Sequence, residues 1–412
     1  MNKKFSEFIK RISLAWTNMF ESPWGAAIAS GFIYLLISAY SGSLFEQSLH
    51  PYYNYLADAF LHGQTYLRQL PPSTHDLSFF NGNYYLYWAP FPAIILMPFV
   101  AIFGVGLNDV LFTIIIAAIN IGLVAKLLRA ACNVGFLHLT KSQRAILVFF
   151  FAFGTVHYTL APFGKVWMTG QLIGFACTLL AYLAAFTFEG RKAWFFTGLA
   201  LGGAMLTRNH LVFTGIFPFI YLLVNEWPWE NKKNFTHIGS GILPLSIALA
   251  FYLVYNQVRF GNPFDTGVNH HIMAEFFSAN YEKYGPFNIH YVPINLYYQY
   301  IFYPFPIRSE STMGGSLFLL SPLFFCVFFA LWKPREKIFI AALLISILLT
   351  NIPILLLMGT GWVQFGPRYT LDFYAPLLFL LALGIEKFPI VISFLLTLIS
   401  VVHYSVGIKI LF

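Results

Sequence analysis

Charged residues are scarce in this sequence: only 10% of its 412 residues are charged, whereas soluble domains carry about 25%. Cysteine is also scarce, and the three cysteines share no motif spacing, so they predict neither a disulfide framework nor a metal site. No P-loop, G-x-G-x-x-G or G-x-S-x-G motif is present, which leaves nucleotide-dependent chemistry without support. A soluble, nucleotide-using enzyme is therefore not expected.

What the chain has instead is hydrophobic sequence, which makes up 58% of its residues. Apolar runs long enough to cross a bilayer recur along the whole length, and they predict an all-α, polytopic transmembrane bundle in a single domain, 1–412, with 11–12 crossings. The expected crossings are 23–43, 108–128, 144–161, 169–188, 193–208, 209–225, 237–257, 313–332, 338–357, 369–385 and 389–409. Residues 1–22 alternate apolar and basic positions at helical spacing, which predicts an amphipathic helix lying on the membrane surface.

Lysine and arginine indicate the orientation, because cytoplasmic loops of membrane proteins are enriched in them. Their clusters fall on one side if the N-terminus is cytoplasmic and the short, proline-containing stretch 89–104 bends back without crossing. This arrangement leaves two long outside loops, 44–88 and 258–312, with short juxtamembrane helices. A twelfth crossing at 89–104 is the alternative. The net charge of +8 reflects the basic loops and does not indicate nucleic-acid binding.

Three arginines run against this trend, because they lie on the outside at membrane depth. Arg208 lies between two apolar runs in AMLTRNHLVF, Arg259 ends a crossing, and Arg368 begins one in GPRYTLDFYAP. A guanidinium binds oxyanions through paired N–H donors, so such arginines suit a phosphate held near the bilayer surface. Snorkelling toward lipid headgroups is the structural alternative.

Aromatic residues are concentrated in the same outside loops. Tyr85, Trp88 and Tyr369 are candidates for contact with a substrate, because aromatic faces stack on sugar rings. An interfacial aromatic belt explains the same enrichment. The histidines lack the i,i+4 spacing with a flanking acid that marks a zinc helix, so no metal is predicted and a divalent metal has no support.

Several blocks of sequence extend the interpretation beyond charge patterns. YNYLADAFLHGQTYL, GTVHYTLAPFGKVWMTGQ, GLALGGAMLTRNHLVF, YNQVRFGNPFDTG and FGPRYTLDFYAPLLFLLALG occur in this order over most of residues 23–385. Their order resembles the GT-C superfamily of polytopic glycosyltransferases, specifically an uncharacterised bacterial branch related to protein O-mannosyltransferases and the transferases that add aminoarabinose to lipid A. Where that superfamily carries an acidic pair after the first crossing, this chain has Glu46-Gln47.

The resemblance implies an enzyme of the bacterial cytoplasmic membrane that transfers a sugar, with inversion, from a polyprenyl-phosphate donor. The acceptor would be an envelope glycan, lipid or protein, membrane lipids would surround the enzyme, and no separate cofactor would be needed. Arg208, Arg259 and Arg368 would hold the donor phosphate.

The resemblance also implies a carboxylate that deprotonates the acceptor. Glu46 and Asp58 are the first candidates for this base. For Asp58, anchoring of a local helix through Arg68 is the structural alternative. Asp76 follows Pro71-Pro72, where an Asp commonly caps a turn. Acids of the second loop, such as Asp265 or Glu275, remain open as well.

Two other classes of function stay open. One is a transporter or flippase for lipid-linked saccharides, although the chain shows no repeat of its two halves. The other is a non-catalytic scaffold, which the missing acidic pair favours.

Overall fold

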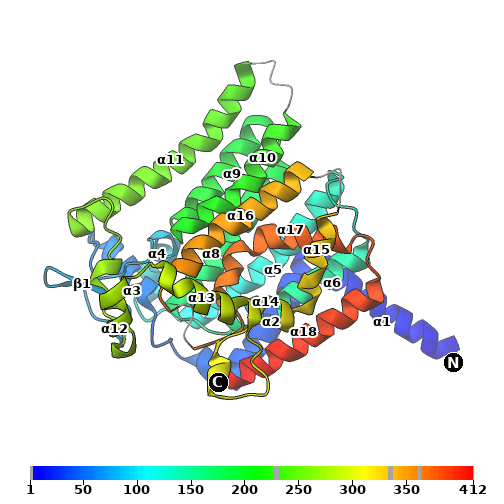
Figure 1. Ribbon diagram of the computed structural model, residues 1–412, viewed down its shortest axis with the longest axis horizontal. Helices are drawn as coiled ribbons and strands as arrows, with labels where there is room; N and C mark the ends of the chain where they lie inside the picture. Colours follow the sequence, from blue (N-terminus) through cyan, green and yellow to red (C-terminus); the bar gives the residue numbers. More distant parts are fainter. Residues whose placement is uncertain (1–2, 227–231, 333–336, 360–362, 412) are drawn as a thin grey trace.

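A computed structural model gives the structure of residues 3–226, 232–332, 337–359 and 363–411. Most of this chain is helical (Figure 1). The α-helices are α1 (Lys3–Glu21), α2 (Pro23–Tyr40), α3 (Tyr52–Leu61), α4 (Phe91–Phe103), α5 (Asp109–Asn133), α6 (Lys141–Phe153), α7 (Val156–Leu160), α8 (Val166–Thr187), α9 (Gly190–Met205), α10 (Ile216–Asn225), α11 (Lys232–Phe260), α12 (Glu275–Tyr284), α13 (Val292–Leu296), α14 (Leu317–Leu320), α15 (Val327–Ala330), α16 (Lys337–Leu356), α17 (Tyr374–Ile385) and α18 (Ile390–Leu411).

Shorter elements connect these helices. The short helical turns, of 3₁₀ or π type, are η1 (Ser43–Phe45), η2 (Asn209–Gly215), η3 (Val268–His270), η4 (Ile289–Tyr291), η5 (Tyr297–Ile301), η6 (Ser309–Thr312), η7 (Pro322–Cys326) and η8 (Arg368–Phe373). The strands are β1 (Ser78–Phe80), β2 (Asn83–Tyr85), β3 (Met313–Gly314) and β4 (Gln364–Phe365). β1 and β2 form an antiparallel hairpin, β3 pairs with β4 in parallel, and two isolated bridges, Ser78 with His271 and Phe287 with Leu357, add single antiparallel contacts.

Seven helical segments of the described chain are long and apolar enough to cross a membrane: α2, α5, α8, α11 from Phe235 onward, α16, η8 with α17, and α18. The other expected crossings fall on shorter or broken segments, namely α6–α7, α9, η2–α10 and α14–η7–α15. Breaks within crossings are tolerated where neighbouring helices satisfy the freed backbone groups. The prediction of an all-α, multi-pass membrane bundle is thus confirmed.

Helix α4 does not connect the two ends of the bundle. Its first amide, that of Phe91, donates to the carbonyl of Leu206, just before the arginine that precedes η2. The turn after its last residue is bound by Gln47 and Asn54, whose side-chain amides donate to the carbonyls of Val105 and Leu107 at 2.6 and 2.8 Å. Both ends of α4 therefore lie at the end of the bundle that carries residues 44–88, which agrees with a stretch 89–104 that bends back.

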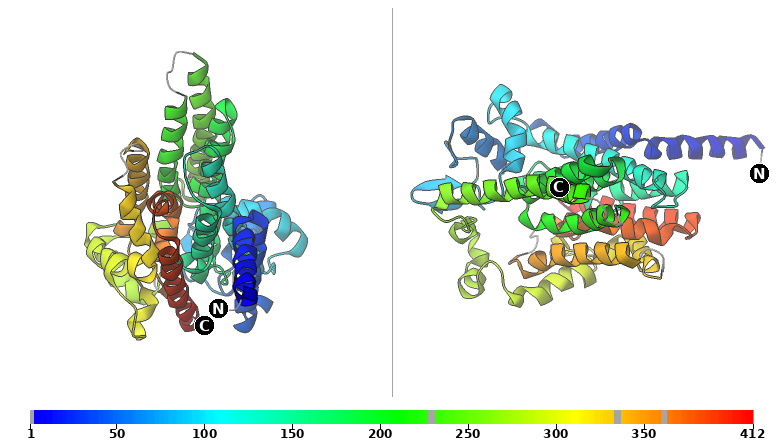
Figure 2. Two further views of the ribbon diagram at one scale, coloured as in Figure 1. Left: turned by 90° about the vertical axis from the view of Figure 1, so that its right-hand side faces the viewer. Right: turned by 90° about the horizontal axis from the view of Figure 1, so that it is seen from above.

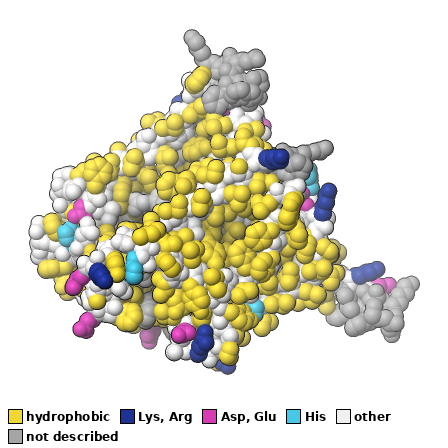
Figure 3. All heavy atoms as spheres, viewed as in Figure 1, with side chains coloured by type: hydrophobic (Ala, Val, Ile, Leu, Met, Phe, Trp, Pro, Cys, Tyr) yellow, Lys and Arg dark blue, Asp and Glu magenta, His cyan; other side chains and the backbone are white. Residues whose placement is uncertain are grey.

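Burial separates central helices from those that face lipid. In α8 and in η8–α17, 89% of the hydrophobic segment is buried inside the protein, against 28% in α2 and in α18. Figure 3 shows hydrophobic side chains covering the middle of one face, with charged side chains gathered toward its edges. Because lipid tails are apolar, such a surface suits the hydrocarbon core of a bilayer.

The closest helix contact is between α9 and α11, which run side by side (Figures 1 and 2). A Cβ atom on Gly198 of α9 would collide with the backbone carbonyl of Gly241 on α11. Small residues permit this close approach in membrane helices.

Replacing Gly198 with alanine is therefore expected to lower the midpoint of thermal unfolding, since overpacking costs about 1–3 kcal/mol. The matched control is Gly239→Ala, because a Cβ atom at Gly239 on α11 meets nothing within 4 Å. Alanine there should be neutral or stabilising by roughly 0.5–1 kcal/mol. Equal midpoints for the two variants would contradict the close contact.

The two long loops pack on each other at one end of the bundle, at the left in Figure 1, and form what we call the loop lobe, residues 44–88 and 258–312. The amide of Ile272 donates to the carbonyl of Leu77 at 2.7 Å, and the amide of Asp76 donates to the carbonyl of Ile272 at 3.0 Å. The Ser78 hydroxyl adds a bond to the carbonyl of Gly267 at 2.7 Å. The two loops are therefore one structural unit, although about two hundred positions separate these residues in the sequence.

The predicted orientation can be tested with single cysteines in a cysteine-free background. Asn81 is exposed at the tip of the β1–β2 hairpin, and Lys141 is exposed at the start of α6, at the opposite end of the bundle. A membrane-impermeant maleimide should label Asn81→Cys in intact cells and Lys141→Cys only after lysis. Labelling of both in intact cells would contradict the topology. Lys333 and Arg335, which also support it from sequence, lie outside the described residues.

Candidate functional site

Two arginines predicted from the sequence lie close to one tyrosine, Tyr369. The guanidinium carbons of Arg208 and Arg368 are 5.2 and 5.0 Å from the centre of the Tyr369 ring. The Arg208 Nε donates to Asp372 Oδ2 at 2.9 Å, and His210 Nε2 lies 2.7 Å from the same oxygen. Because Asp372 is only 2% exposed, it neutralises Arg208 within the protein and fixes its position.

The backbone that carries Arg368 is held by close local packing. Gly366 has a φ of 78° and leaves no room for a side chain beside Tyr404. The Thr370 hydroxyl donates to the carbonyl of Pro367 at 2.7 Å, and the Gln171 amide donates to the carbonyl of Arg368 at 3.2 Å. This glycine–proline turn therefore places Arg368 at the start of η8, where a membrane segment meets the loop lobe.

Arg368 differs from Arg208 because no acid neutralises it. Its side chain is buried, its Nε has no hydrogen-bond partner, and its Nη2 reaches only the hydroxyl of Tyr369 at 3.4 Å. Lys165 caps the start of α8 nearby; burial lowers the pKa of its amine, and Arg368 lowers that pKa further. Among the described residues, neither side chain forms an ion pair with a carboxylate. Both cations therefore lie in this region of the described chain without an ion-pair partner of their own.

Asp76, a carboxylate hydrogen-bonded to a histidine, lies on the loop-lobe side of Lys165 and Arg368. Asp76 Oδ1 is 2.8 Å from His271 Nε2 and 3.3 Å from His75 Nε2, and its Oδ2 accepts from Trp167 Nε1 at 3.0 Å. Asp76 has a φ of 64°, which is uncommon outside glycine and clusters at functional sites. Three different segments of the chain thus converge on one carboxylate.

The protonation state of Asp76 follows from its partners. Burial would raise the pKa of this carboxyl, but the hydrogen bond from His271, with the adjacent charges of His271 and His75, outweighs burial and lowers the pKa below its usual value. Asp76 is therefore ionised at neutral pH. It acts as an acceptor toward His271 and fixes the orientation of that imidazole.

Tyr87 links the acidic and the basic groups. Burial raises the pKa of its hydroxyl well above the usual value; Asp76 raises it further, while Arg208 and Arg368 lower it. Its ring stacks on Trp88 at 4.0 Å. The Tyr87 ring also lies 4.9 Å from that of His271. We call this group of residues the polar site: Asp76, Tyr87, Trp88, Lys165, Arg208, His271, Arg368, Tyr369 and Asp372.

The two acids predicted first from the sequence lie elsewhere. Glu46 is exposed after η1 and has no hydrogen bond or ion pair within the described chain. Asp58 lies on α3, where its carboxylate is 3.2 Å from Arg68 Nη1 and 3.5 Å from His62 Nδ1. No hydrogen bond or ion pair joins either acid to the polar site among the residues that the structure describes.

Arg259 and Tyr85 also lie outside the polar site. The buried guanidinium of Arg259 donates to the carbonyl of Leu86 at 2.8 Å and to Asn256 Oδ1 at 2.6 Å, and it stacks on the Tyr255 ring at 3.9 Å. The Tyr85 ring is 5.2 Å from Phe260. These contacts attach the end of α11 to the segment that follows β2, and within the described chain no hydrogen bond or ion pair joins Arg259 to the polar site.

Four residues of this region were not among the predicted site residues: Lys165, Trp167, His271 and Asp372. Lys165 and Trp167 lie inside one of the family-like blocks, GKVWMTGQ, which is a signal that could have identified them. Asp372 likewise lies inside the block FGPRYTLDFYAP. His271 lies in none of the blocks, and its partner Asp76 is 195 positions away. Within the described chain, no group of three or more His, Cys, Asp or Glu side chains is arranged to hold a metal ion.

His50 gives the region a testable pH dependence. Its ring packs on Trp167 at 4.8 Å, and burial, with Lys165 and His75 nearby, lowers its pKa from 6.5 to about 4. Between these values the unfolded chain binds a proton that the folded chain does not, so stability rises with pH. The unfolding midpoint should therefore fall as the pH is lowered from 7 to 5, and His50→Gln should flatten this dependence. Parallel curves for the two proteins would contradict the assignment.

No family model matches this chain, and no curated protein matches it. Among solved structures, it is similar to the crystal structure of ArnT from Cupriavidus metallidurans bound to undecaprenyl phosphate. The TM-score is 0.45 and the sequence identity is 15%, over 88% of this chain and 60% of the ArnT chain. The chain thus spans less than two thirds of the length of ArnT.

Proposed function

We propose that this chain is a glycosyltransferase of the cytoplasmic membrane that moves a sugar from a polyprenyl-phosphate donor to an acceptor of the cell envelope. The observation that carries the proposal is the pair Lys165 and Arg368, two partly or fully buried cations without an acid partner. Two like charges in a site of low dielectric repel each other, and an anion bound between them would relieve this repulsion. A phosphate is such an anion, and its lipid tail would keep it at this depth.

The sugar of the donor would lie next to Tyr87 and Trp88. Their rings stack at 4.0 Å, and Trp88 meets Trp167 edge-on at 6.3 Å, which makes a rigid aromatic wall beside the charged groups. Arg208, already neutralised by Asp372, would orient Tyr369 and would add hydrogen bonds to the phosphate through its free Nη groups. Lys165 and Arg368 would stabilise the negative charge that grows on the phosphate as the glycosidic bond breaks.

The base that removes the acceptor proton is best supplied by Asp76 with His271. The acceptor oxygen or nitrogen would attack the anomeric carbon from the side opposite the phosphate, the carbon–oxygen bond to phosphate would break, and the proton would pass to the dyad. The 2.8 Å bond to Asp76 would stabilise the imidazolium that results. Glu46 and Asp58 remain alternative bases by sequence resemblance.

The proposal is tested with purified protein in vesicles supplied with polyprenyl-phosphate sugars. Release of polyprenyl phosphate, with transfer or hydrolysis of the sugar, is the expected result. Binding of the lipid without release would instead indicate a scaffold. Movement of the intact lipid between leaflets, measured by protection from a soluble glycosidase, would indicate a flippase. Either of these two outcomes would overturn the enzyme assignment.

A further inference from the structure

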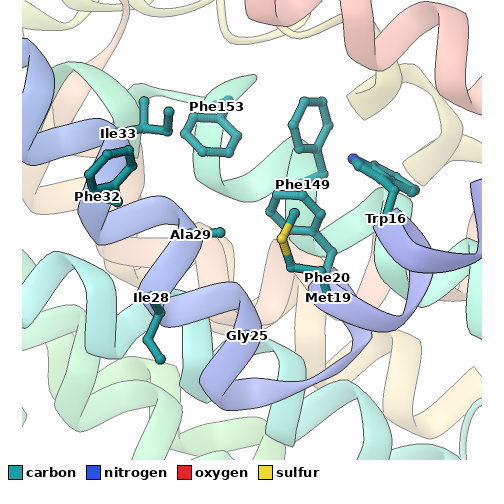
Figure 4. Close-up of a pocket in the computed structure, with 10 residues that line it drawn as sticks. All are labelled: Trp16, Met19, Phe20, Gly25, Ile28, Ala29, Phe32, Ile33, Phe149 and Phe153. Carbon is teal, nitrogen blue, oxygen red and sulfur yellow. The ribbon is translucent and has the colours of Figure 1, made fainter. Parts of the chain in front are cut away.

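A second feature lies far from the polar site: an apolar groove of about 720 Å³ between α1, α2 and α6. Figure 4 shows side chains facing it from all three helices, among them Met19 and Phe20 from α1, Ala29 and Ile33 from α2, and Phe149 from α6. The space exists because α1 turns away from α2 at Ser22-Pro23, where one helix ends and the next begins. A groove this apolar suits a hydrocarbon chain.

The groove is only as deep as one leaflet. On α2 it runs from Gly25 to Ile33, which corresponds to about 12 Å of helix, and half of the bilayer core is about 15 Å. Its Gly25 end lies at the start of α2, whereas the loop lobe follows the other end of that helix at Tyr40. The groove therefore belongs to the leaflet opposite the polar site. A transmembrane helix of a partner would need the full depth, but an acyl chain would not.

Positive charge surrounds the Gly25 end. Glu21 follows Phe20, and its carboxylate is 2.6 Å from Arg144 Nη2 and 3.8 Å from Arg129 Nη2. Two guanidinium groups share this one carboxylate, and the Nε of each has no hydrogen-bond partner. The Arg129 side chain is also 42% exposed. Exposed Lys141, on the same helix as Arg144, adds further positive charge near Glu21.

We propose that this groove binds an anionic phospholipid of the leaflet opposite the polar site. One acyl chain would lie along Ala29 and Ile33, and the phosphate would accept hydrogen bonds from Arg129 at the mouth. The charge decides between lipid classes, because the excess of guanidinium over carboxylate favours a headgroup with net negative charge. The lipid would hold α1 against the bundle, so its role is structural and independent of the proposed transferase activity.

The test is native mass spectrometry of the delipidated full-length protein with phosphatidylglycerol or phosphatidylcholine of identical acyl chains. The wild type should retain one phosphatidylglycerol in preference to phosphatidylcholine. Arg129→Gln should weaken the binding of phosphatidylglycerol by about tenfold and remove the preference over phosphatidylcholine. This is the effect expected when one charge-assisted contact is lost. Ala29→Phe should fill the groove and weaken the binding of both lipids.

The matched control is Ala250→Phe, which places the same ring on the exposed, lipid-facing side of α11. It should bind lipid as the wild type does. Equal retention of the two lipids by the wild type, or unchanged retention in Arg129→Gln, would overturn the proposal. Arg129 also donates to the carbonyl of Glu21 at 2.9 Å, so the unfolding midpoint of Arg129→Gln is measured beside its lipid retention, and Ala29→Phe tests the groove without touching this bond. A dimer that disappears in Ala29→Phe would also overturn the proposal, because the groove would then be an interface between two copies.

Discussion

Replacing Arg368 with alanine is expected to weaken binding of polyprenyl phosphate by tenfold or more. Arg368 is 7% exposed and has a free Nε, so a phosphate would find a donor already freed from water. A buried hydrogen bond between charged groups contributes about 1.5–3 kcal/mol, and about 1.4 kcal/mol corresponds to tenfold in affinity. Titration of the protein in nanodiscs with polyprenyl phosphate would measure the loss.

Three companion variants define the cause of that loss. Arg368→Lys should restore only part of the affinity, since an ammonium is a point charge and lacks the planar fork. Lys165→Ala by itself should also weaken binding of polyprenyl phosphate. In the double variant with Arg368→Ala the loss should be less than the sum of the two single losses, because both cations would face one phosphate. Arg191→Ala, an exposed arginine at the start of α9, is the matched control and should bind normally. Wild-type affinity in Arg368→Ala would remove this residue from the phosphate site.

Replacing Asp76 with asparagine is expected to lower turnover by roughly a hundredfold to ten-thousandfold while donor binding survives, which is the range for loss of a general base. Asparagine keeps the shape of the side chain and an acceptor for Trp167, but it cannot stabilise a protonated His271. His271→Gln should produce a similar fall. Measured with a saturating donor, the effect should therefore appear in kcat, with little change in donor KM.

Glu46→Gln and Asp58→Asn provide the comparison that decides which acid serves. If the dyad is the base, Glu46→Gln should retain near-normal turnover. Asp58→Asn should act mainly on the stability of α3 through its contact with Arg68. Normal turnover in Asp76→Asn, together with a large loss of turnover in Glu46→Gln or Asp58→Asn, would assign the base to Glu46 or Asp58 instead.

The transmembrane architecture was predictable from sequence, because a long apolar run has few alternatives to a membrane helix. Counting lysine and arginine predicted that 89–104 bends back without crossing. The helix breaks near Gly154 and Pro322 were not predictable, because they depend on how neighbouring helices pack. The depth of Arg208 and Arg368 could likewise be inferred from the apolar sequence around them.

The assembly of the site could not be inferred in the same way. Nothing in the local sequence indicates that Asp372 neutralises Arg208 or that Asp76 binds His271. These pairings depend on how η2, η8 and the loop lobe approach one another in space. Arg259 shows the converse case: its position in sequence resembles that of Arg208, but in the structure Arg208 pairs with Asp372, whereas Arg259 bonds the carbonyl of Leu86 and the side chain of Asn256.

Helix α4 has a consequence for the bilayer itself. It has 13 residues, about 20 Å in length, and begins and ends at the face of the loop lobe, while Phe99, Ile102 and Phe103 remain exposed. A helix in that position displaces acyl chains from one monolayer only. We expect the lipids of that monolayer to be spread apart and the hydrocarbon layer beside the protein to be thinner there. We therefore expect a large polar headgroup that approaches along the membrane to meet fewer neighbouring lipids beside α4 than elsewhere around the protein.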